Sequence, residues 1–322
     1  MSCPDCFKGS ILAGEPVGAI SSIEGAYLSP APEDSEDSEK AVVLLTDIFG
    51  LPLNNPKVIA DSLAKRLGCD VWVPDLFADK ANNQSIGKPP FEVEKMSYQP
   101  PERAGEKFSQ FKFIMSVLPS LPKLLKNRAS VVDKRLTKFF EKLRQERPHY
   151  KKIGAVGYCF GGATAVRFGK TDYVHSIVVC HPGPFSDKDL KAVKVPCSWV
   201  CAEDDFTFPK AKREKAEAEF AKGKDPSHQY QFEVYKGTTH GFACRPNMEY
   251  PEVKEGFEGA MDQTVEWFKK TLDTETISPE SQPARASSML APATERATED
   301  SPAQETAEAA QNVAAVPVTL AA

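Results

Sequence analysis

The stretch KKIGAVGYCFGGATAV, residues Lys151–Val166, decides the fold of this chain. A short apolar run, typical of a buried strand, ends in a cluster of glycines, and a helix-forming segment follows directly. The pattern Gly157-x-Cys159-x-Gly161 has the form of a nucleophile elbow, with cysteine where serine is more usual. Glycines suit this sharp turn because larger side chains would clash with the strand and the helix. The turn also places Cys159 at a helix N-terminus, where backbone N–H groups favour an anion.

Alone, this motif is weak evidence for catalysis. The chain has eight cysteines, and several of them lie inside apparent strands. Free cysteine is commonly a small buried apolar residue, and disulfides are unexpected in a reducing compartment. Whether Cys159 is a nucleophile or a core residue therefore depends on the rest of the chain.

Apolar strands alternate with amphipathic helices on both sides of this stretch. We expect strands at residues 41–50, 69–77, 151–158, 173–183, 193–205 and 229–237, and helices at 55–68, 128–146, 161–170, 209–223 and 253–272. Strands that are apolar throughout and alternate with helices predict an α/β fold, with a mostly parallel central sheet covered by helices on both faces. In the first helix, Asn55 is the expected N-cap and Gly68 the expected C-terminal stop.

Composition divides the chain into three segments. Residues 1–40 form a mixed N-terminal segment with an acidic, Ser/Pro-rich connector, and residues 41–274 carry the alternation of strands and helices. Residues 275–322 are rich in Ala, Pro, Ser, Thr and Glu and nearly lack aromatic residues. Such a segment cannot bury enough surface to offset its ordering entropy, so we expect a disordered C-terminal tail.

Charge and hydropathy exclude several classes of protein. The net charge is −5 and the lysines and arginines are scattered, so the sequence predicts no nucleic-acid partner. The longest apolar runs are only strand-sized, and the N-terminus lacks the features of a signal peptide. We therefore expect a cytoplasmic protein that has no membrane partner and is a monomer by default.

Two further stretches with reactive side chains follow later strands. One strand ends in three acids, Glu203, Asp204 and Asp205, which could orient a catalytic histidine or simply form a solvated turn. The last strand leads to His240. The order nucleophile, acid, histidine is that of α/β-hydrolase triads, and each group follows a strand. Order and position together favour Cys159 as a nucleophile.

The motifs TDIFG, GYCFGG, AEDDFTFP and THGFACRP, taken together, resemble the dienelactone hydrolase family from about Gly18 to Leu272. The cysteine elbow separates this family from the many serine α/β-hydrolases. The resemblance implies the α/β-hydrolase fold, a small ester or lactone as substrate, and hydrolysis through a thioester acyl-enzyme. It also implies that neither a metal nor an organic cofactor is needed.

The resemblance implies a Cys–His–Asp triad formed by Cys159, His240 and Asp205. Asp205 is preferred to Asp204 because the acid of the family stands four residues before a proline, which is Pro209 here.

The resemblance also implies roles for the TDIFG loop. In the family this loop carries an acid near the thiol, and its backbone supplies one N–H group of the oxyanion hole. These roles fall here on Asp47 and on the backbone N–H groups of Ile48 and Phe160. The founding bacterial enzymes have glutamate at the place of Asp47, which is one methylene shorter.

Lactone hydrolases of the family hold a substrate carboxylate with arginines, one of them shortly after the histidine. Here Cys244 occupies that place, and Arg245 follows one residue later. Arg103 is the nearest candidate for a second arginine. Both arginines are expected substrate-binding residues, although a shift of one residue can turn a side chain away.

Three alternatives stay open. The same machinery could serve an acyl-transfer or cyclisation step of a biosynthetic pathway. The chain could also be a scaffold that keeps the fold with little activity. Finally, the pair Cys3 and Cys6 could indicate a zinc or redox protein, but no second pair with ligand spacing accompanies it.

Overall fold

The computed structural model describes residues 11–35, 39–78, 87–91, 101–222 and 229–273. The predicted disordered tail, 275–322, and the pair Cys3 and Cys6 lie outside the described residues. The predicted segment boundaries stay predictions, although two short strands before residue 41 already join the sheet.

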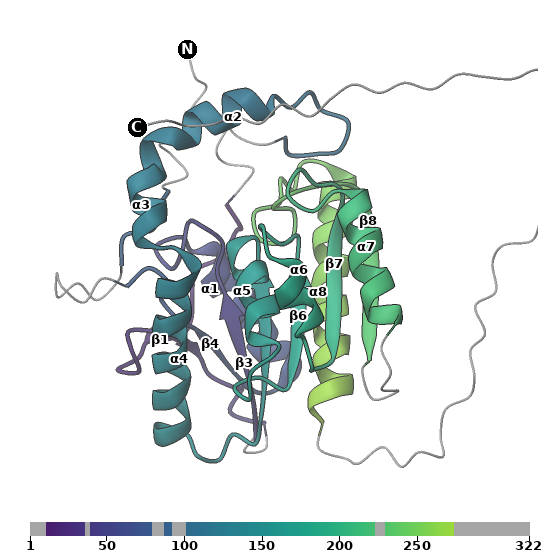
Figure 1. Cartoon of the computed structure of the whole chain (residues 1–322). Coiled ribbons are helices and arrows are strands. Elements are labelled where there is room, and N and C mark those ends of the chain that lie inside the picture. The colour runs from purple at the N-terminus through teal and green to yellow at the C-terminus, as the bar shows by residue number, and fades with distance from the viewer. Residues whose placement is uncertain (1–10, 36–38, 79–86, 92–100, 223–228, 274–322) are drawn as a thin grey trace, which may run out of the picture. The chain divides into compact units, whose positions relative to one another are not determined.

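A mostly parallel sheet of eight strands forms the centre of the described fold (Figure 1), as the sequence predicts. The strand order is β1-β2-β4-β3-β5-β6-β7-β8; the six strands from β4 to β8 in this order pair in parallel, and β1 and β2 pair antiparallel at one edge. The strands are β1 (Ala19–Ile20), β2 (Tyr27–Ser29), β3 (Lys40–Leu45), β4 (Asp70–Val73), β5 (Lys152–Tyr158), β6 (Ser176–Cys180), β7 (Cys197–Asp204) and β8 (Tyr230–Thr239).

Helices cover both faces of this sheet, which explains why its central strands β3, β5 and β6 are mostly apolar. Helices α1 (Asn55–Leu67) and α8 (Pro251–Leu272) pack on one face. The other face is covered by α4 (Ala129–Glu146), α5 (Phe160–Phe168), α6 (Asp187–Lys191) and α7 (Lys210–Ala221). The remaining helical segment consists of α2 (Gln110–Val117), η4 (Leu118–Ser120) and α3 (Leu121–Lys126).

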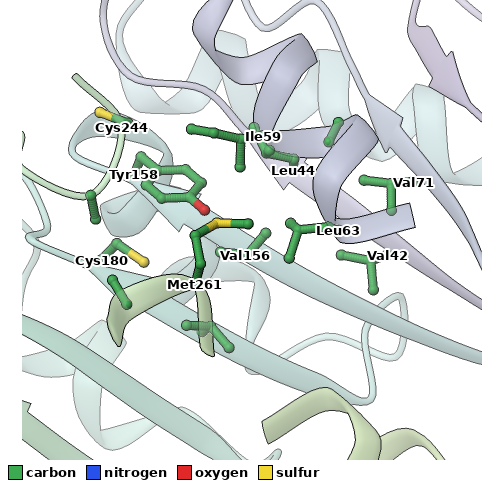
Figure 2. Packing of buried hydrophobic residues seen from close by; sticks show 14 of the residues in the cluster. Val42, Leu44, Ile59, Leu63, Val71, Val156, Tyr158, Cys180, Cys244 and Met261 are labelled. Carbon is green, nitrogen blue, oxygen red and sulfur yellow. The ribbon is translucent and has the colours of Figure 1, made fainter. Parts of the chain in front are cut away.

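Alternation along each strand sends side chains to two separate cores. On β3, Val42 and Leu44 point to the α1 and α8 side, whereas Val43 and Leu45 point to the α4 and α5 side. Figure 2 shows the first of these cores, where Leu44 lies near Ile59 of α1. Because both faces of the central strands β3 to β7 are buried, the strand ends and the loops beyond them carry the polar groups.

The first helix begins differently from the prediction. Asn55 is the first residue of α1 and not its N-cap, which is Asn54. The Asn55 side chain is buried; its Oδ1 accepts from the Leu12 N–H at 3.1 Å and its Nδ2 donates to the Cys244 carbonyl at 2.9 Å. These contacts between distant segments determine the role of Asn55. The predicted C-terminal stop is confirmed, because Gly68 adopts the left-handed conformation at φ 62°.

Within the part of the chain that the structure describes, no helix has both the length and the apolar character to cross a bilayer. The six cysteines described are all free, and all but Cys159 are buried, as expected for core thiols.

Candidate active site

Cys159 sits in a strained turn between β5 and α5. Its φ of 52° and ψ of −111° lie outside the regions that non-glycine residues normally adopt. Two backbone hydrogen bonds hold this conformation: the Cys159 N–H donates to the Cys180 carbonyl at 3.1 Å, and the Gly183 N–H donates to the Cys159 carbonyl at 2.8 Å. The side chain is only partly buried, so the turn presents the thiol at the carboxyl edge of the sheet.

The glycines of the elbow are required by close backbone contacts. A Cβ on Gly157 would lie 2.1 Å from the Gly161 carbonyl oxygen, and a Cβ on Gly161 would lie 2.0 Å from the Leu45 carbonyl oxygen. Neither contact can be relieved by a side-chain rotation, because the atoms belong to the backbone. At both positions a larger side chain would therefore clash with the neighbouring backbone, as the sequence predicts.

His240 and Asp205 lie side by side at the ends of β8 and β7. His240 Nδ1 is 3.0 Å from each carboxylate oxygen of Asp205, and both side chains are buried. The carboxylate is held in place by N–H groups of Thr207, at 2.8 Å, and of Phe208, at 3.0 Å. Asp204, the neighbouring acid, is exposed. Of the three acids that the sequence left open, Asp205 is thus the one that contacts the histidine.

Electrostatics link these two groups to Cys159. Burial lowers the pKa of His240, but the charge of Asp205, the charge of Cys159 and hydrogen bonds to both groups together raise this pKa to about 10. Burial likewise raises the pKa of Asp205, and the charge of His240 and its hydrogen bond outweigh that effect and hold this pKa well below its usual range. Because His240 Nδ1 is bonded to Asp205, Nε2 is the ring nitrogen left for Cys159. The site therefore favours a protonated imidazole at neutral pH.

The titration of His240 gives a direct test of this arrangement. The chain has five histidines, so the imidazole NMR signals can be followed individually. We expect the His240 signal to titrate near pH 10 and its pKa to fall in Asp205→Asn, because that variant removes the neighbouring negative charge. Exposed His149 is the internal control. Titration of His240 near its ordinary value of about 6.5 in the wild type would contradict the arrangement.

The backbone N–H groups of Phe160 and Ile48 are the predicted donors of the oxyanion hole. The Phe160 N–H is at the first residue of α5, and Ile48 lies in the loop that follows β3. Neither N–H donates to another group in the part of the chain described here. The close approach of Gly161 to Leu45 brings the start of α5 against the end of β3. Both donors are therefore positioned at the edge of the sheet that carries Cys159.

Asp47 is a buried carboxylate that forms an ion pair with Arg245. The Arg245 Nε donates to Asp47 Oδ2 at 2.8 Å, and the guanidinium lies 4.5 Å from the centre of the Phe49 ring. Asp47 Oδ1 accepts from the Phe49 N–H at 3.0 Å. Burial lowers the pKa of Arg245, but the charge of Asp47 more than offsets this and raises it. The one-residue shift therefore does not turn Arg245 away from this edge of the sheet.

Cys244 is a second thiol in the same region. Its Sγ contacts Asp47 Oδ2 and the Gly241 carbonyl, each at 3.6 Å. Burial, followed by the charge of Asp47, raises the pKa of the Cys244 thiol well above its ordinary value. This environment keeps Cys244 protonated and inert, in contrast to the partly exposed position of Cys159.

Arg103 lies apart from the groups described so far. Its guanidinium is 3.3 Å from Glu106, 3.9 Å from Glu252 and 4.6 Å from the centre of the Tyr250 ring. In the described structure none of its contacts is with the three predicted triad residues. A substrate-binding role for Arg103 stays a prediction.

The structure adds three residues that the sequence did not single out. The Thr207 hydroxyl is 2.8 Å from Asp205 Oδ1 and 3.0 Å from His240 Nδ1, and the ring of Phe206 is 5.0 Å from the ring of His240. His181 is fully buried; its ring is 5.1 Å from that of His240, and burial and then the charge of His240 hold its pKa well below the usual range. Of these three, Thr207 could have been found from the sequence, because it stands only two residues after Asp205.

Comparison with known proteins shows what the chain as a whole is similar to. A model described as the dienelactone hydrolase family matches residues 25–272. Hydrolase tropI of Talaromyces stipitatus is 33% identical over 275 residues, which cover 83% of this chain and 95% of the relative. The human carboxymethylenebutenolidase homolog is 28% identical over 260 residues, which cover 77% of this chain and 87% of the relative.

Solved structures show the same fold. A putative dienelactone hydrolase from Klebsiella pneumoniae has a TM-score of 0.53 and 14% sequence identity, over 76% of this chain and 92% of that chain. Similarity at this level of identity establishes the architecture of the sheet and its helices.

Proposed function

The chain belongs to the dienelactone hydrolase family and is a hydrolase acting on ester bonds, and from this premise we propose that it cleaves a small carboxylic ester or lactone through a thioester on Cys159. The observation that carries the proposal is the hydrogen bond of His240 Nδ1 with Asp205, together with the electrostatic interaction of His240 with Cys159 that helps to raise the pKa of the imidazole. A nucleophile, a base that interacts with it and a group that orients the base are what acyl transfer requires.

In the first half of the reaction, His240 holds the proton taken from the Cys159 thiol. The sulfur attacks the carbonyl carbon of the substrate, and the carbonyl electrons move to its oxygen. When the tetrahedral intermediate collapses, the carbon–oxygen ester bond breaks, and His240 gives its proton to the departing alcohol. Asp205 fixes the orientation of the ring and stabilises its positive charge. The acyl group stays on Cys159 as a thioester.

In the second half, water replaces the alcohol. His240 takes a proton from water, the hydroxide attacks the thioester carbon, and the carbon–sulfur bond breaks. The acid product leaves and the thiolate–imidazolium pair is restored. In both halves, the N–H groups of Ile48 and Phe160 donate to the oxyanion, and removal of one such donor typically costs ~3 kcal/mol of transition-state stabilisation.

Arg245 is the proposed site for an anionic group of the substrate. Its guanidinium is largely buried, lies beside the loop that supplies Ile48, and is paired only with Asp47 among the described carboxylates. The charge of Cys159 is among the causes that raise the pKa of Arg245. Asp47 thus holds the arginine at the thiol edge of the site, and we propose this positioning role for it. Arg103 is the second proposed substrate-binding arginine.

A substrate panel tests the proposal. We expect turnover of aryl esters and small lactones, because their activated carbonyls acylate a thiol readily, and a thioester on Cys159 detectable by mass spectrometry after rapid quenching. If Arg245 binds a substrate carboxylate, Arg245→Gln will raise KM for carboxylated lactones such as a dienelactone and leave KM for simple aryl esters unchanged.

Several outcomes would contradict the proposal. Turnover without any covalent adduct would argue against the thioester. Acylation without hydrolysis, followed by transfer to an added alcohol or amine, would indicate an acyl-transfer enzyme. Exposed Arg128→Gln serves as the control for Arg245→Gln, because it removes the same charge outside the predicted site.

A further inference from the structure

The helical segment 110–126, formed by α2, η4 and α3, exposes an unusual amount of apolar surface. Six of the eleven large apolar side chains that are exposed in the described part of the chain lie in this segment, with exposed fractions from 46% to 73%. They are Phe111, Ile114, Met115, Leu118, Leu121 and Leu125. Apolar groups gathered on one surface element, in contrast to single scattered ones, indicate a surface that another body covers.

These side chains, called here the apolar stripe, are distributed over α2, η4 and α3. On α2, Phe111 stands three and four residues before Ile114 and Met115, and Leu118 follows these two after four and three residues, which is the repeat of one helix face. Pro119 and Pro122 lie where α2 gives way to η4 and then to α3. Figure 1 shows α2 running across the top of the domain and α3 descending toward α4.

The opposite side of α2 is already used inside the protein. Phe113 is half-buried, and its ring lies 5.7 Å from that of Phe108 and 5.2 Å from that of Phe206. Phe206 in turn contacts His240. The helix is therefore apolar on both sides: the inner side packs toward the predicted active site, and the outer side has no counterpart among the described residues.

The charged residues in and around segment 110–126 indicate what kind of surface covers its outer side. The segment between Glu106 and Asp133 contains no acidic residue, although the whole chain has a net charge of −5. It contains five cations, Lys107, Lys112, Lys123, Lys126 and Arg128. All five are exposed, and none forms an ion pair in the described structure. A helix with an apolar stripe flanked by basic residues is the usual form of a surface-binding amphipathic helix.

We propose that segment 110–126 is an interfacial docking surface for an anionic lipid surface, with its apolar stripe inserted and its lysines on the headgroups. A second copy of this chain fits less well, since an isologous dimer would bring two basic, acid-free patches together. Docking on a surface requires no spanning helix. The proposal does not depend on the triad or on the nature of the acyl-enzyme.

Co-sedimentation of the full-length protein with vesicles tests this inference. We expect binding to mixed phosphatidylcholine–phosphatidylserine vesicles, weakening as salt is added, and little binding to phosphatidylcholine alone. Ile114→Gln combined with Leu118→Gln should weaken partitioning by at least about tenfold. Lys123→Gln and Lys126→Gln should each weaken it about fivefold.

Matched controls separate docking from folding and from catalysis. Val17→Gln changes an even more exposed apolar side chain elsewhere, and it should bind vesicles as the wild type does. The far-ultraviolet circular dichroism spectrum of the double variant should match that of the wild type. Cys159→Ser should also keep vesicle binding, so failure of the proposed chemistry would leave this inference untouched.

Three results would overturn the inference. One is the absence of vesicle binding by the folded wild type, and another is equal binding to neutral and anionic vesicles. The third is a concentration-dependent dimer, seen by light scattering, that Ile114→Gln with Leu118→Gln dissociates; this would make a second copy the occupant of the surface.

Discussion

Cys159→Ala is expected to lower ester turnover by at least about 10⁴-fold while the protein stays folded, because the proposed reaction has no nucleophile without the thiol. Alanine adopts the strained backbone at this position no better and no worse than cysteine, so the change adds little backbone strain. Steady-state hydrolysis of an aryl ester measures the first effect, and thermal unfolding measures the second.

Cys69→Ala is the matched control for this experiment. Cys69 is another free cysteine, but it is buried, and burial raises the pKa of its thiol to about 12. It should therefore be unreactive, and its replacement should leave turnover within a small factor of wild type. Wild-type turnover in Cys159→Ala, or loss of turnover in a folded Cys69→Ala, would refute the assignment of the nucleophile.

Gly161→Ala is expected to lower the free energy of unfolding by ~3 kcal/mol or more, at the upper end of the cost of overpacking. The new Cβ would lie 2.0 Å from the Leu45 carbonyl oxygen and 2.7 Å from that of Thr46. To avoid them, the start of α5 must move away from β3. That movement also displaces the Phe160 N–H, so turnover should fall even at temperatures where the variant is folded.

Gly183→Ala is the control for Gly161→Ala. Gly183 also borders the elbow, but its Cβ would meet the nearest atom, the Cys159 carbonyl oxygen, at an ordinary 3.4 Å. Urea unfolding of the two variants should therefore separate them clearly. Similar stability of Gly161→Ala and wild type would mean that the elbow is less tightly packed than these distances indicate.

The predicted sheet and the predicted elbow come from local rules. Continuous apolar runs such as 41–45 and 152–158 must be buried on both faces, and only a helix-covered parallel sheet achieves this for alternating strands and helices. The elbow also follows from a local rule, because backbone atoms lie too close to Gly157 and Gly161 for any Cβ. Cys159 and His240 each follow directly after a parallel strand, so the same rule places both at the carboxyl edge of the sheet.

Other features depend on contacts that no local pattern contains. The carboxylate of Asp205 contacts His240, whereas Asp204 is exposed, although the two acids are neighbours in the chain. The segment 110–126 carries no strong pattern of a buried helix, because its outer side is as apolar as its inner side. Asn55 was misplaced as a cap for a similar reason, since its partners Leu12 and Cys244 are remote in sequence.

By itself, then, the sequence determined the strand–helix alternation, the glycine elbow and the order along the chain of the proposed triad residues Cys159, Asp205 and His240. These follow from periodicity and backbone sterics, which act between near neighbours. Only the tertiary structure decided that Arg245 pairs with Asp47 beside the thiol and that α2 turns an apolar, basic surface outward. Both outcomes depend on how segments far apart in the chain pack together, and local sequence preferences do not specify that packing.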